Sequence, residues 1–488
     1  MARGAPILAA LLVAALAPLP AAASAADPAT GPLAPLRPDG RWLKDRAGRI
    51  VIVHGLQVAH KTAPYLPPAR SFTDRDARWI ASLGFNAVRL AWFWRGLEPR
   101  RGVYDRAYLE RYAGQARMLM RRGIFVLAEA HQDVYSERVF GAGFPDWATL
   151  TDGIPPGRRG GFSDYFKPAA LRAFDSLNSN RDGLQDAFAA AWGRVAGALR
   201  ADPRLLGYDL YNEPWPGSSV EVCGSARGCP AWDRDVLGPL QDRLARAVRE
   251  HDRRGIAWYE PNLFFDFGRP TYLARRPADV GPVGFGFHAY CTAGAARPDR
   301  ESTVPGYARR CGRADGRVFA NGLATARRLG GPPLFAEFGD TQDVRHIRRL
   351  VDLADARKLG WLYWGWKDWV DVPGGKGHGA LFADSDDDST FRARKAAALA
   401  EPYPAATAGE PLAWRFDPAR RSFSFRWRPD RRIHAPTVVA VPPINFPRGY
   451  RVRVRGARVV SRPGAARLAL RADRAPGSAS LRLTPANR

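Results

Sequence analysis

The sequence predicts an α/β protein: a (β/α)8 TIM barrel followed by a small C-terminal antiparallel β-sandwich. Short, near-continuous apolar segments alternate with longer amphipathic segments, as expected for parallel strands covered by helices. Beyond Glu401 the helical periodicity stops, and short alternating segments separated by turn residues follow. A chain of 488 residues is long enough to bury one large core and a smaller second one.

The barrel prediction depends on eight strands and the helices between them. The expected strands are residues 50–54, 87–92, 124–130, 205–211, 255–259, 284–288, 334–337 and 361–364. The expected helices are residues 74–83, 106–121, 183–200, 232–252, 318–329 and 342–358. We place the barrel at residues 41–402 and the sandwich at residues 405–488, with strands at 423–428, 437–441, 450–455, 467–470 and 480–483.

The N-terminus has the pattern of a secretory signal peptide. Arg3 precedes an apolar stretch over residues 7–19, and Ala23-Ser24-Ala25 is a small-residue cleavage signal. The pattern predicts that residues 1–25 are removed and that the protein is secreted (extracellular). Residues 26–40 are rich in Ala, Pro and Gly and are expected to form an extended lead-in. The later sequence has no apolar stretch of about 18 residues, the length that a membrane-spanning helix needs.

The four cysteines are interpreted in the light of this export. Cys223, Cys229, Cys291 and Cys311 form an even set, which suggests disulfides outside the cytosol. Proximity in sequence favours Cys223 with Cys229 and Cys291 with Cys311, although four cysteines allow three pairings. A metal site is the alternative, but the sequence has no Cys-x-x-Cys or His-x-x-x-His spacing to support it.

The chain is strongly basic, with a net charge of +26 carried mostly by arginine. Beyond residue 405, arginines outnumber acidic residues by about 14. One interpretation is attraction to anionic surfaces such as phospholipid membranes or sialylated glycans. The other, which we favour, is a GC-rich genome that enriches Arg, Ala, Gly and Pro codons. No recognised nucleic-acid-binding module or basic helix occurs in the sequence, so we expect no nucleic acid partner.

Two apolar segments end abruptly on a glutamate. Asn212-Glu213-Pro214-Trp215 ends the fourth predicted strand, and Glu337 ends the seventh, 124 residues later. Strands four and seven face each other across the mouth of a barrel, so both carboxyl groups could flank one substrate. Retaining glycosidases use two carboxyl groups about 5 Å apart, one as acid/base and one as nucleophile. We assign these roles to Glu213 and Glu337, and a separation above roughly 10 Å would exclude the assignment.

Polar side chains at other strand ends could support this pair. Arg89 lies inside the second apolar strand, where a buried cation needs a carboxylate partner. Pairing with Glu337 would keep that glutamate ionised, whereas a structural ion pair elsewhere is the alternative. Asn212 could hold the 2-hydroxyl of a sugar. The other candidates are His131 and Asp133 for sugar hydroxyls, His288 and Tyr290 beside the nucleophile, and Trp364 as the floor of the −1 sugar site.

Two further glutamates lie at or near strand ends. Glu260 ends the fifth strand and could bind a hydroxyl, or take the nucleophile role in place of Glu337. Glu129 precedes His131 by two residues, so both side chains point to the same side of the strand. We therefore expect Glu129 to contact the residues that bind substrate rather than the substrate itself.

Two loops are longer than a barrel requires. Residues 134–180 and 262–283 follow strands and are rich in aromatic residues, and long loops on this face of a barrel are usually functional. Their aromatic rings could grip a sugar chain, shelter an acyl chain, or simply pack on the rim. The sandwich, in turn, could bind carbohydrate or membrane, or could serve as a structural cap.

The site residues resemble the pattern of glycoside hydrolase family 5. The match consists of Arg89, His131, Asn212-Glu213-Pro214, His288, Tyr290, Glu337 and Trp364. Four longer strings resemble the endoglycoceramidases within that family, namely His60-Lys61-Thr62-Ala63-Pro64-Tyr65, Ala130-His131-Gln132-Asp133-Val134-Tyr135, Asn212-Glu213-Pro214-Trp215-Pro216-Gly217 and Ala336-Glu337-Phe338-Gly339. Residues 142–180 do not match residue by residue, which leaves the preferred glycan series open.

The resemblance implies an endo-β-glycosidase that cuts between an intact oligosaccharide and ceramide with net retention. It implies acid/base chemistry from Glu213, nucleophilic attack by Glu337, and glycan contacts from Lys61, His131, Asp133, Asn212, Tyr290 and Trp364. We expect no metal or cofactor. The expected partner is a glycolipid or glycoside substrate bound by a monomer, with peripheral contact to an anionic membrane surface as an additional hypothesis.

Two other functions stay open. Another family 5 β-glycosidase, such as a steryl-glucoside β-glucosidase or a cellulase-like endoglucanase, would share the barrel and both glutamates. A carbohydrate- or membrane-binding protein without enzymatic activity would instead use the basic C-terminal region. An apolar surface on the leaving-group side of Glu213 would favour the lipid substrate.

Overall fold

The computed structural model describes residues 31–291, 306–367, 369, 379–473 and 477–486. The signal peptide predicted at residues 1–25 lies outside the described residues. Among the described residues, the helices lack the combination of length and apolar character that a bilayer span requires.

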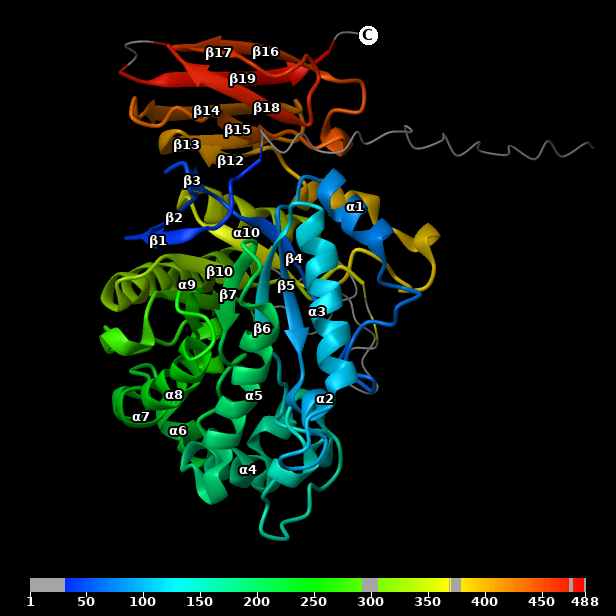
Figure 1. Ribbon diagram of the computed structural model, residues 1–488, viewed down its shortest axis with the longest axis vertical. Coiled ribbons are helices and arrows are strands. Elements are labelled where there is room, and N and C mark those ends of the chain that lie inside the picture. Colours follow the sequence, from blue (N-terminus) through cyan, green and yellow to red (C-terminus); the bar gives the residue numbers. More distant parts are fainter. Residues whose placement is uncertain (1–30, 292–305, 368, 370–378, 474–476, 487–488) are drawn as a thin grey trace, which may run out of the picture.

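The predicted parallel barrel is present, and its eight strands close in chain order (Figure 1). The barrel strands are β4 (His54–Val58), β5 (Ala87–Trp92), β6 (Phe125–Ala130), β7 (Leu205–Asp209), β8 (Ala257–Tyr259), β9 (Val283–His288), β10 (Pro333–Glu337) and β11 (Gly360–Tyr363). Each strand is nearly fully buried because it faces the barrel interior on one side and helices on the other.

The first barrel strand was predicted in the wrong place. Residues 50–54 were expected to form it, but β3 (Ile50–Val51) belongs to a different sheet and the barrel begins at His54. Two buried segments follow each other here, and the second contains His54 and Gln57, whose polar side chains weaken its apolar pattern. The more apolar segment, residues 50–53, therefore fits the pattern of a buried barrel strand better than β4 itself does.

The helices cover the outside of the barrel (Figure 1). They are α1 (Asp74–Ser82), α2 (Trp94–Leu97), α3 (Arg106–Arg121), α4 (Pro168–Asn178), α5 (Leu184–Leu199), α6 (Val220–Cys223), α7 (Pro230–Trp232), α8 (Gly238–Arg249), α9 (Tyr307–Leu329), α10 (Val344–Ala356) and α11 (Ala393–Leu399). The start of α9 precedes the predicted start at residue 318, because its first turns contain Gly312, Gly316 and several arginines that hide the periodicity. The predicted helix at 232–252 is interrupted by a π-helical turn, Asp233–Leu237.

The second domain is a β-sandwich built from both ends of the chain. Its larger sheet has the order β1–β2–β3–β12–β15–β18–β17, and its smaller sheet has the order β13–β14–β19–β16. The strands are β1 (Arg37–Asp39), β2 (Trp42–Lys44), β3, β12 (Tyr403–Thr407), β13 (Gly409–Asp417), β14 (Ser422–Pro429), β15 (Thr437–Ala440), β16 (Tyr450–Arg455), β17 (Ala457–Val459), β18 (Arg467–Ala472) and β19 (Ala479–Pro485). Residues 37–51 were expected in the lead-in and the barrel, but they extend the larger sheet through the pairing of β3 with β12.

The sandwich packs on the amino-terminal end of the barrel strands. Val53, Ala87 and Leu334, near the starts of strands, share an apolar cluster with Val51 and Val438 of the larger sheet. In Figure 1 the sandwich lies at the top, and the barrel strands run downward towards α2 and α4. The carboxyl ends of the strands, where barrel active sites form, are therefore left uncovered by the second domain.

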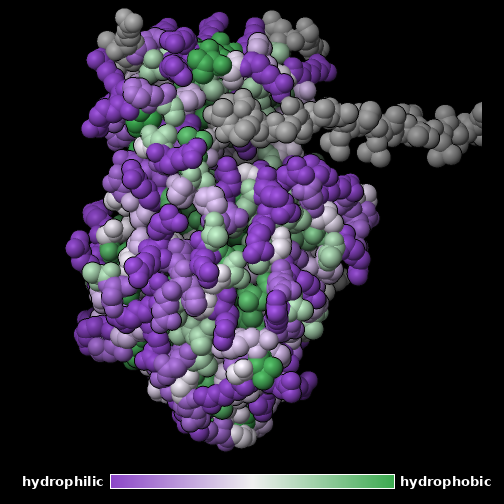
Figure 2. Space-filling model, viewed as in Figure 1, coloured by the Kyte–Doolittle hydropathy of each residue, from purple (hydrophilic) through white to green (hydrophobic). Residues whose placement is uncertain are grey.

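The basic excess of the C-terminal region lies on a solvent-exposed surface. Alternate residues of the smaller sheet point outward, and the exposed set contains Arg415, Arg426, Arg428, Arg451, Arg453, Arg455 and Arg482. Figure 2 shows hydrophilic side chains over much of the sandwich at the top of the view. The other face of this sheet is apolar, so the alternation predicted from sequence is that of a half-buried strand.

Both disulfides predicted from sequence proximity are present. Cys223 is bonded to Cys229, and Cys291 is bonded to Cys311. The first bond closes a short turn after α6, and the second attaches the segment after β9 to the first turns of α9.

A single substitution tests the sandwich core. Trp427 in β14 is fully buried and stacks on Phe425 with ring centroids 4.8 Å apart. We expect Trp427→Ala to lower the free energy of unfolding by about 3–5 kcal/mol, because it leaves a cavity. Arg426→Ala, on the exposed face of the same strand, is the matched control and should change it by less than about 0.5 kcal/mol. Urea unfolding of both variants makes the comparison, and equal effects would contradict the assignment of the two faces.

Candidate active site

The two predicted glutamates meet at the mouth of the barrel. Glu213 follows β7, the fourth barrel strand, and Glu337 ends β10, the seventh. A carboxylate oxygen of each lies within 4.8 Å of the other. The backbone of Glu213 has a φ of 45°, which non-glycine residues seldom adopt, and its N–H donates to Glu260 Oε2 at 2.9 Å. The separation agrees with the roughly 5 Å expected for a nucleophile and an acid/base on one sugar ring.

Arg89 binds the ends of several strands together. Its side chain is fully buried and donates to Asp209 at 2.7 Å, Glu337 at 2.7 Å and Glu260 at 2.8 Å. It also donates to Asn212 at 3.0 Å and Gln57 at 3.3 Å. Burial alone would lower the pKa of Arg89, but the surrounding carboxylates, led by Glu129, raise it well above its usual value. The guanidinium therefore stays charged at any working pH.

The predicted ion pair between Arg89 and Glu337 is present, and Tyr290 adds a second donor. The Tyr290 hydroxyl donates to Glu337 Oε1 at 2.8 Å, while Arg89 occupies Oε2. Burial raises the pKa of Glu337 above its ordinary value, and the charges of His288 and Arg89 work in the opposite direction. The ion pair thus offsets burial in part rather than setting the pKa alone.

His288 bridges Glu213 and Glu260. Its Nδ1 lies 2.9 Å from Glu213 Oε1 and its Nε2 lies 3.1 Å from Glu260 Oε1. Burial would lower the pKa of His288, but Glu260 and Glu337 raise it well above the ordinary value. Burial likewise opposes ionisation of Glu260, yet His288 and Arg89 lower its pKa to about 2. Glu260 is only 1% exposed, so it holds neighbouring groups in place and is poorly placed to attack a substrate.

A second charged network follows β4 and β6. Lys61 Nζ lies 2.8 Å from Asp133 Oδ2 and 4.3 Å from the centre of the Trp364 ring. His131 lies between Glu129, at 2.6 Å, and Asp133, at 3.2 Å, and stacks on Trp364. Burial would lower the pKa of His131, but these two carboxylates raise it to about 10. Glu129 is fully buried behind His131, where the strand alternation placed it.

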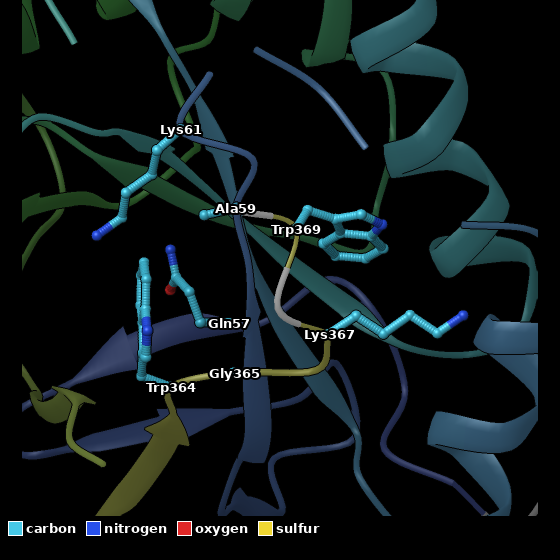
Figure 3. A pocket seen from close by; sticks show the side chains of 7 residues that line it. All are labelled: Gln57, Ala59, Lys61, Trp364, Gly365, Lys367 and Trp369. Atoms are coloured by element: carbon cyan, nitrogen blue, oxygen red, sulfur yellow. The ribbon is translucent and has the colours of Figure 1, made fainter. Parts of the chain in front are cut away.

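A hollow beside this network is lined by Gln57, Ala59, Lys61, Trp364, Gly365, Lys367 and Trp369 (Figure 3). The Lys61 ammonium and the Trp364 ring face the same space, whereas the Lys367 side chain points away from Trp364. Lys367 instead donates to the backbone of Ser71 at 2.8 Å. Trp364 and Lys61 thus give the hollow an aromatic face beside a cation, a combination suited to a sugar ring and its hydroxyls.

A second surface, which begins two residues after Glu213, is aromatic. Trp215 is buried, and its ring centroid lies 4.9 Å from that of Phe264 and 5.1 Å from that of Phe166. Phe166 and its neighbour Phe162 are 43% and 53% exposed. Phe162 also contacts Phe267, so the two predicted loops meet here. We call Trp215, Phe162, Phe166, Phe264 and Phe267 the aromatic rim.

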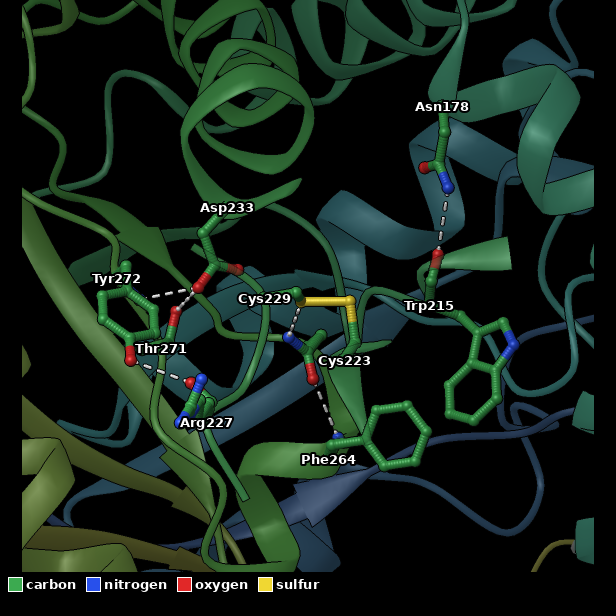
Figure 4. Close-up of a disulfide and its surroundings, with 10 residues drawn as sticks. Asn178, Trp215, Cys223, Arg227, Cys229, Asp233, Phe264, Thr271 and Tyr272 are labelled. Atoms are coloured by element: carbon green, nitrogen blue, oxygen red, sulfur yellow. Dashed lines mark hydrogen bonds between the residues drawn. A yellow bond between two sulfur atoms is a disulfide. The ribbon is translucent and has the colours of Figure 1, made fainter. Parts of the chain in front are cut away.

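The two long loops are thus only partly a packed rim. Part of the loop at residues 134–180 packs into the protein core, where Tyr135, Phe144 and Tyr165 are buried. These three residues agree with the expectation of simple packing on the rim. The turn Leu263–Phe267 is fixed by several hydrogen bonds around the Cys223–Cys229 disulfide (Figure 4). Asn262 accepts from Phe264 N–H at 3.1 Å and its amide contacts Cys229 Sγ at 3.7 Å. Hydrogen bonds therefore fix the backbone of the part of the aromatic rim that contains Phe264 and Phe267.

The structure brings every candidate site residue to one end of the barrel, and it adds three that sequence reasoning missed. Gln57 donates to Glu129 at 2.8 Å, Asp209 pairs with Arg89, and Asp266 lies beside Glu213 and His288. A polar residue inside each apolar strand was a usable signal for Gln57 and Asp209. Asp266 lies in a loop, where no periodicity indicates which way a side chain points.

A parallel barrel with two close carboxyl groups at the ends of its fourth and seventh strands defines a glycoside hydrolase. The chain belongs to glycoside hydrolase family 5: residues 56–369 match the cellulase family (glycosyl hydrolase family 5), and residues 402–483 match the family 5 C-terminal domain.

Its relatives include several endoglycoceramidases. The chain is 33% identical to endoglycoceramidase I of Rhodococcus hoagii over 91% of this chain and 87% of that protein. It is 28% identical to endoglycoceramidase of Cyanea nozakii over 86% of each. The solved structure of endo-glycoceramidase II from Rhodococcus sp. covers 91% of this chain and 100% of its own, with a TM-score of 0.77 and 28% identity. Structures of that protein include a lactosyl-enzyme intermediate and a ganglioside GM3 complex.

Removing the central cation tests the electrostatics of the site. We expect Arg89→Met to lower the free energy of unfolding by about 3–5 kcal/mol, because it leaves several buried carboxylates without their cation. The loss should shrink as the pH falls, since those carboxylates then take up protons. The control is Arg106→Met, an exposed helix residue paired with Glu110, with an expected change of less than about 0.5 kcal/mol. Urea unfolding at two pH values measures both effects, and a pH-independent loss would contradict this account.

Proposed function

We propose that the protein is a secreted, retaining endo-β-glycosidase that cleaves glycosphingolipids between the oligosaccharide and ceramide. The observation that carries the proposal is the close pair Glu213 and Glu337, with a charged sugar-binding side and an aromatic side around it. Kinship with endoglycoceramidases and the ganglioside complex of one relative support the lipid substrate.

In the proposed cycle Glu337 attacks the anomeric carbon while Glu213 protonates the departing oxygen. The lactosyl-enzyme intermediate of the solved relative supports such a covalent step and hence retention. Glu213, now a carboxylate, then takes a proton from water, which releases the sugar from Glu337. Arg89 and Tyr290 orient the nucleophile, and the carboxyl groups and a water supply all the chemistry, so no metal or cofactor enters the scheme.

The sugar is proposed to bind between Trp364 and the charged residues around it. Trp364 offers a ring face, and the other proposed glycan contacts are Lys61, His131, Asp133, Asn212 and Tyr290. The ion pair of Lys61 with Asp133 and the clamp on His131 hold these groups before substrate arrives. Such preorganisation lowers the entropic cost of binding.

Ceramide is proposed to leave along the aromatic rim. The rim begins at Trp215, two residues after the proposed acid, and its exposed members are Phe162 and Phe166. Exposed apolar patches of this kind usually mark sites that contact a ligand, a protein or a membrane. We extend the proposal to a monomer that is exported by its N-terminal signal and makes peripheral contact with an anionic membrane.

The lipid substrate is tested by incubating the protein with gangliosides and with neutral glycosphingolipids. We expect intact oligosaccharide and free ceramide in equimolar amounts, detected by mass spectrometry. Glu337→Gln is the negative control. Hydrolysis of a soluble β-glucan or a steryl glucoside without any release of ceramide would assign the protein to a different branch of the family.

The two glutamate roles are tested by substrates that differ in leaving group. Glu213→Ala should lower kcat/KM on a natural glycolipid by about 10²–10⁴-fold, because the departing oxygen loses its proton donor. The same variant should lose far less on an aryl glycoside with an activated leaving group, which needs little protonation. Glu337→Gln should remove turnover of both substrates while circular dichroism shows an intact fold. Equal losses of Glu213→Ala on the two substrates would show that the roles are misassigned.

A further inference from the structure

A third carboxylic acid lies against the proposed acid/base. Asp266 belongs to the turn Leu263–Phe267 after β8 and is 3% exposed, and it faces His288 Nδ1, the same nitrogen that lies 2.9 Å from Glu213 Oε1. Its Oδ2 lies 3.9 Å from His288 Nδ1, and no hydrogen-bond donor of the described residues reaches that oxygen. Two carboxyl groups can share a hydrogen bond only if one of them carries a proton.

Backbone contacts hold Asp266 against Glu213. Leu263 N–H, in the same turn, donates to Pro214 O at 3.1 Å, directly beyond Glu213. Tyr290 N–H donates to Asp266 O at 3.3 Å. The turn is therefore fixed to the segments that carry both the proposed acid/base and a neighbour of the nucleophile. The position of the Asp266 side chain is therefore set by the backbone around it, as is expected for a residue that orients a functional group.

The surroundings favour the protonated form of Asp266. Burial and the adjacent Glu213 raise the pKa of Asp266 well above its ordinary value, although His288 works in the opposite direction. The titratable and charged groups that face the pair from the neighbouring elements are His288, Glu260, Glu337, Arg89, Tyr290 and Tyr165. Among these, Glu260 and Glu337 add negative charge, which further disfavours a second carboxylate beside Glu213.

We propose that Asp266 is a positioning residue that stays protonated through the cycle and donates its O–H to the Glu213 carboxylate. The proposal depends on the acid/base role of Glu213. In the first half, the Glu213 proton passes to the departing oxygen, which keeps the electron pair of the broken bond, and Glu337 forms the ester. In the second half, water gives its proton to Glu213, its oxygen attacks the anomeric carbon, and the ester breaks. Asp266 keeps its own proton and stabilises the charge that Glu213 carries between the two halves.

The test compares pH profiles of kcat/KM for Asp266→Asn and Asp266→Leu. Asp266→Asn keeps an N–H donor of the same shape, so activity and the alkaline limb of the profile should stay close to those of the wild-type enzyme. Asp266→Leu removes the donor, and we expect kcat/KM to fall by about 10- to 100-fold, the value of one hydrogen bond to a charged group. The alkaline limb should also move to higher pH by about one unit, because Glu213 then gives up its proton less readily. Asp266→Ala replaces the leucine variant if that protein does not fold.

Two results would overturn the proposal. A shift of the alkaline limb to lower pH in both variants would show that Asp266 is ionised in the working enzyme. An equal loss in both variants with an unchanged profile would show a purely structural role. Asp279→Ala, which removes an exposed acid paired with Arg246 before the start of β9, is the control and should leave the profile unchanged. Any glycoside that the wild-type protein cleaves serves as substrate, so a wrong lipid assignment does not affect this test, whereas a wrong role for Glu213 appears separately in Glu213→Ala.

Discussion

The Arg89 guanidinium is the interaction on which the site depends. It lies inside the barrel and hydrogen-bonds groups on or directly after β4, β7, β8 and β10, including Asp209, Glu260 and Glu337. Only a planar group with five N–H donors can serve so many acceptors at once. Because these acceptors lie at strand ends, one side chain fixes the positions of the proposed nucleophile and of the residue that anchors the proposed acid/base. The spacing of the two glutamates follows from this arrangement.

The mouth of the barrel has two chemically different sides. Lys61, Asp133 and His131 form a charged network around Trp364, whereas the aromatic rim begins at Trp215. Each side is built from different loops, and the second is fixed around the Cys223–Cys229 bond. The sandwich packs on the opposite end of the barrel, so it covers neither of them. A molecule with a sugar at one end and an apolar group at the other would match the charged network and the aromatic rim, respectively.

The sequence revealed the parts of the structure that leave a local trace. An arginine inside an apolar strand predicted its ion pair with Glu337, and two glutamates at strand ends predicted the close pair. The pairing of β3 with β12 joins segments more than 350 residues apart in the chain, and no local pattern records it. Asp266 was missed for a related reason: its orientation is set by hydrogen bonds between loops, which periodicity does not describe.

The buried charges also explain how such a site could work with little rearrangement. In the proposed cycle the negative charge leaves Glu337 when the ester forms and appears on Glu213, whose carboxyl group lies within 4.8 Å of it. His288 lies 2.9 Å from Glu213 and 3.9 Å from Glu337, so the same cation faces both positions of the charge. The net charge of the buried site therefore stays constant, and fixed donors stabilise each state in turn. Electrostatic stabilisation of this kind is effective because the donors are already in place when the charge moves.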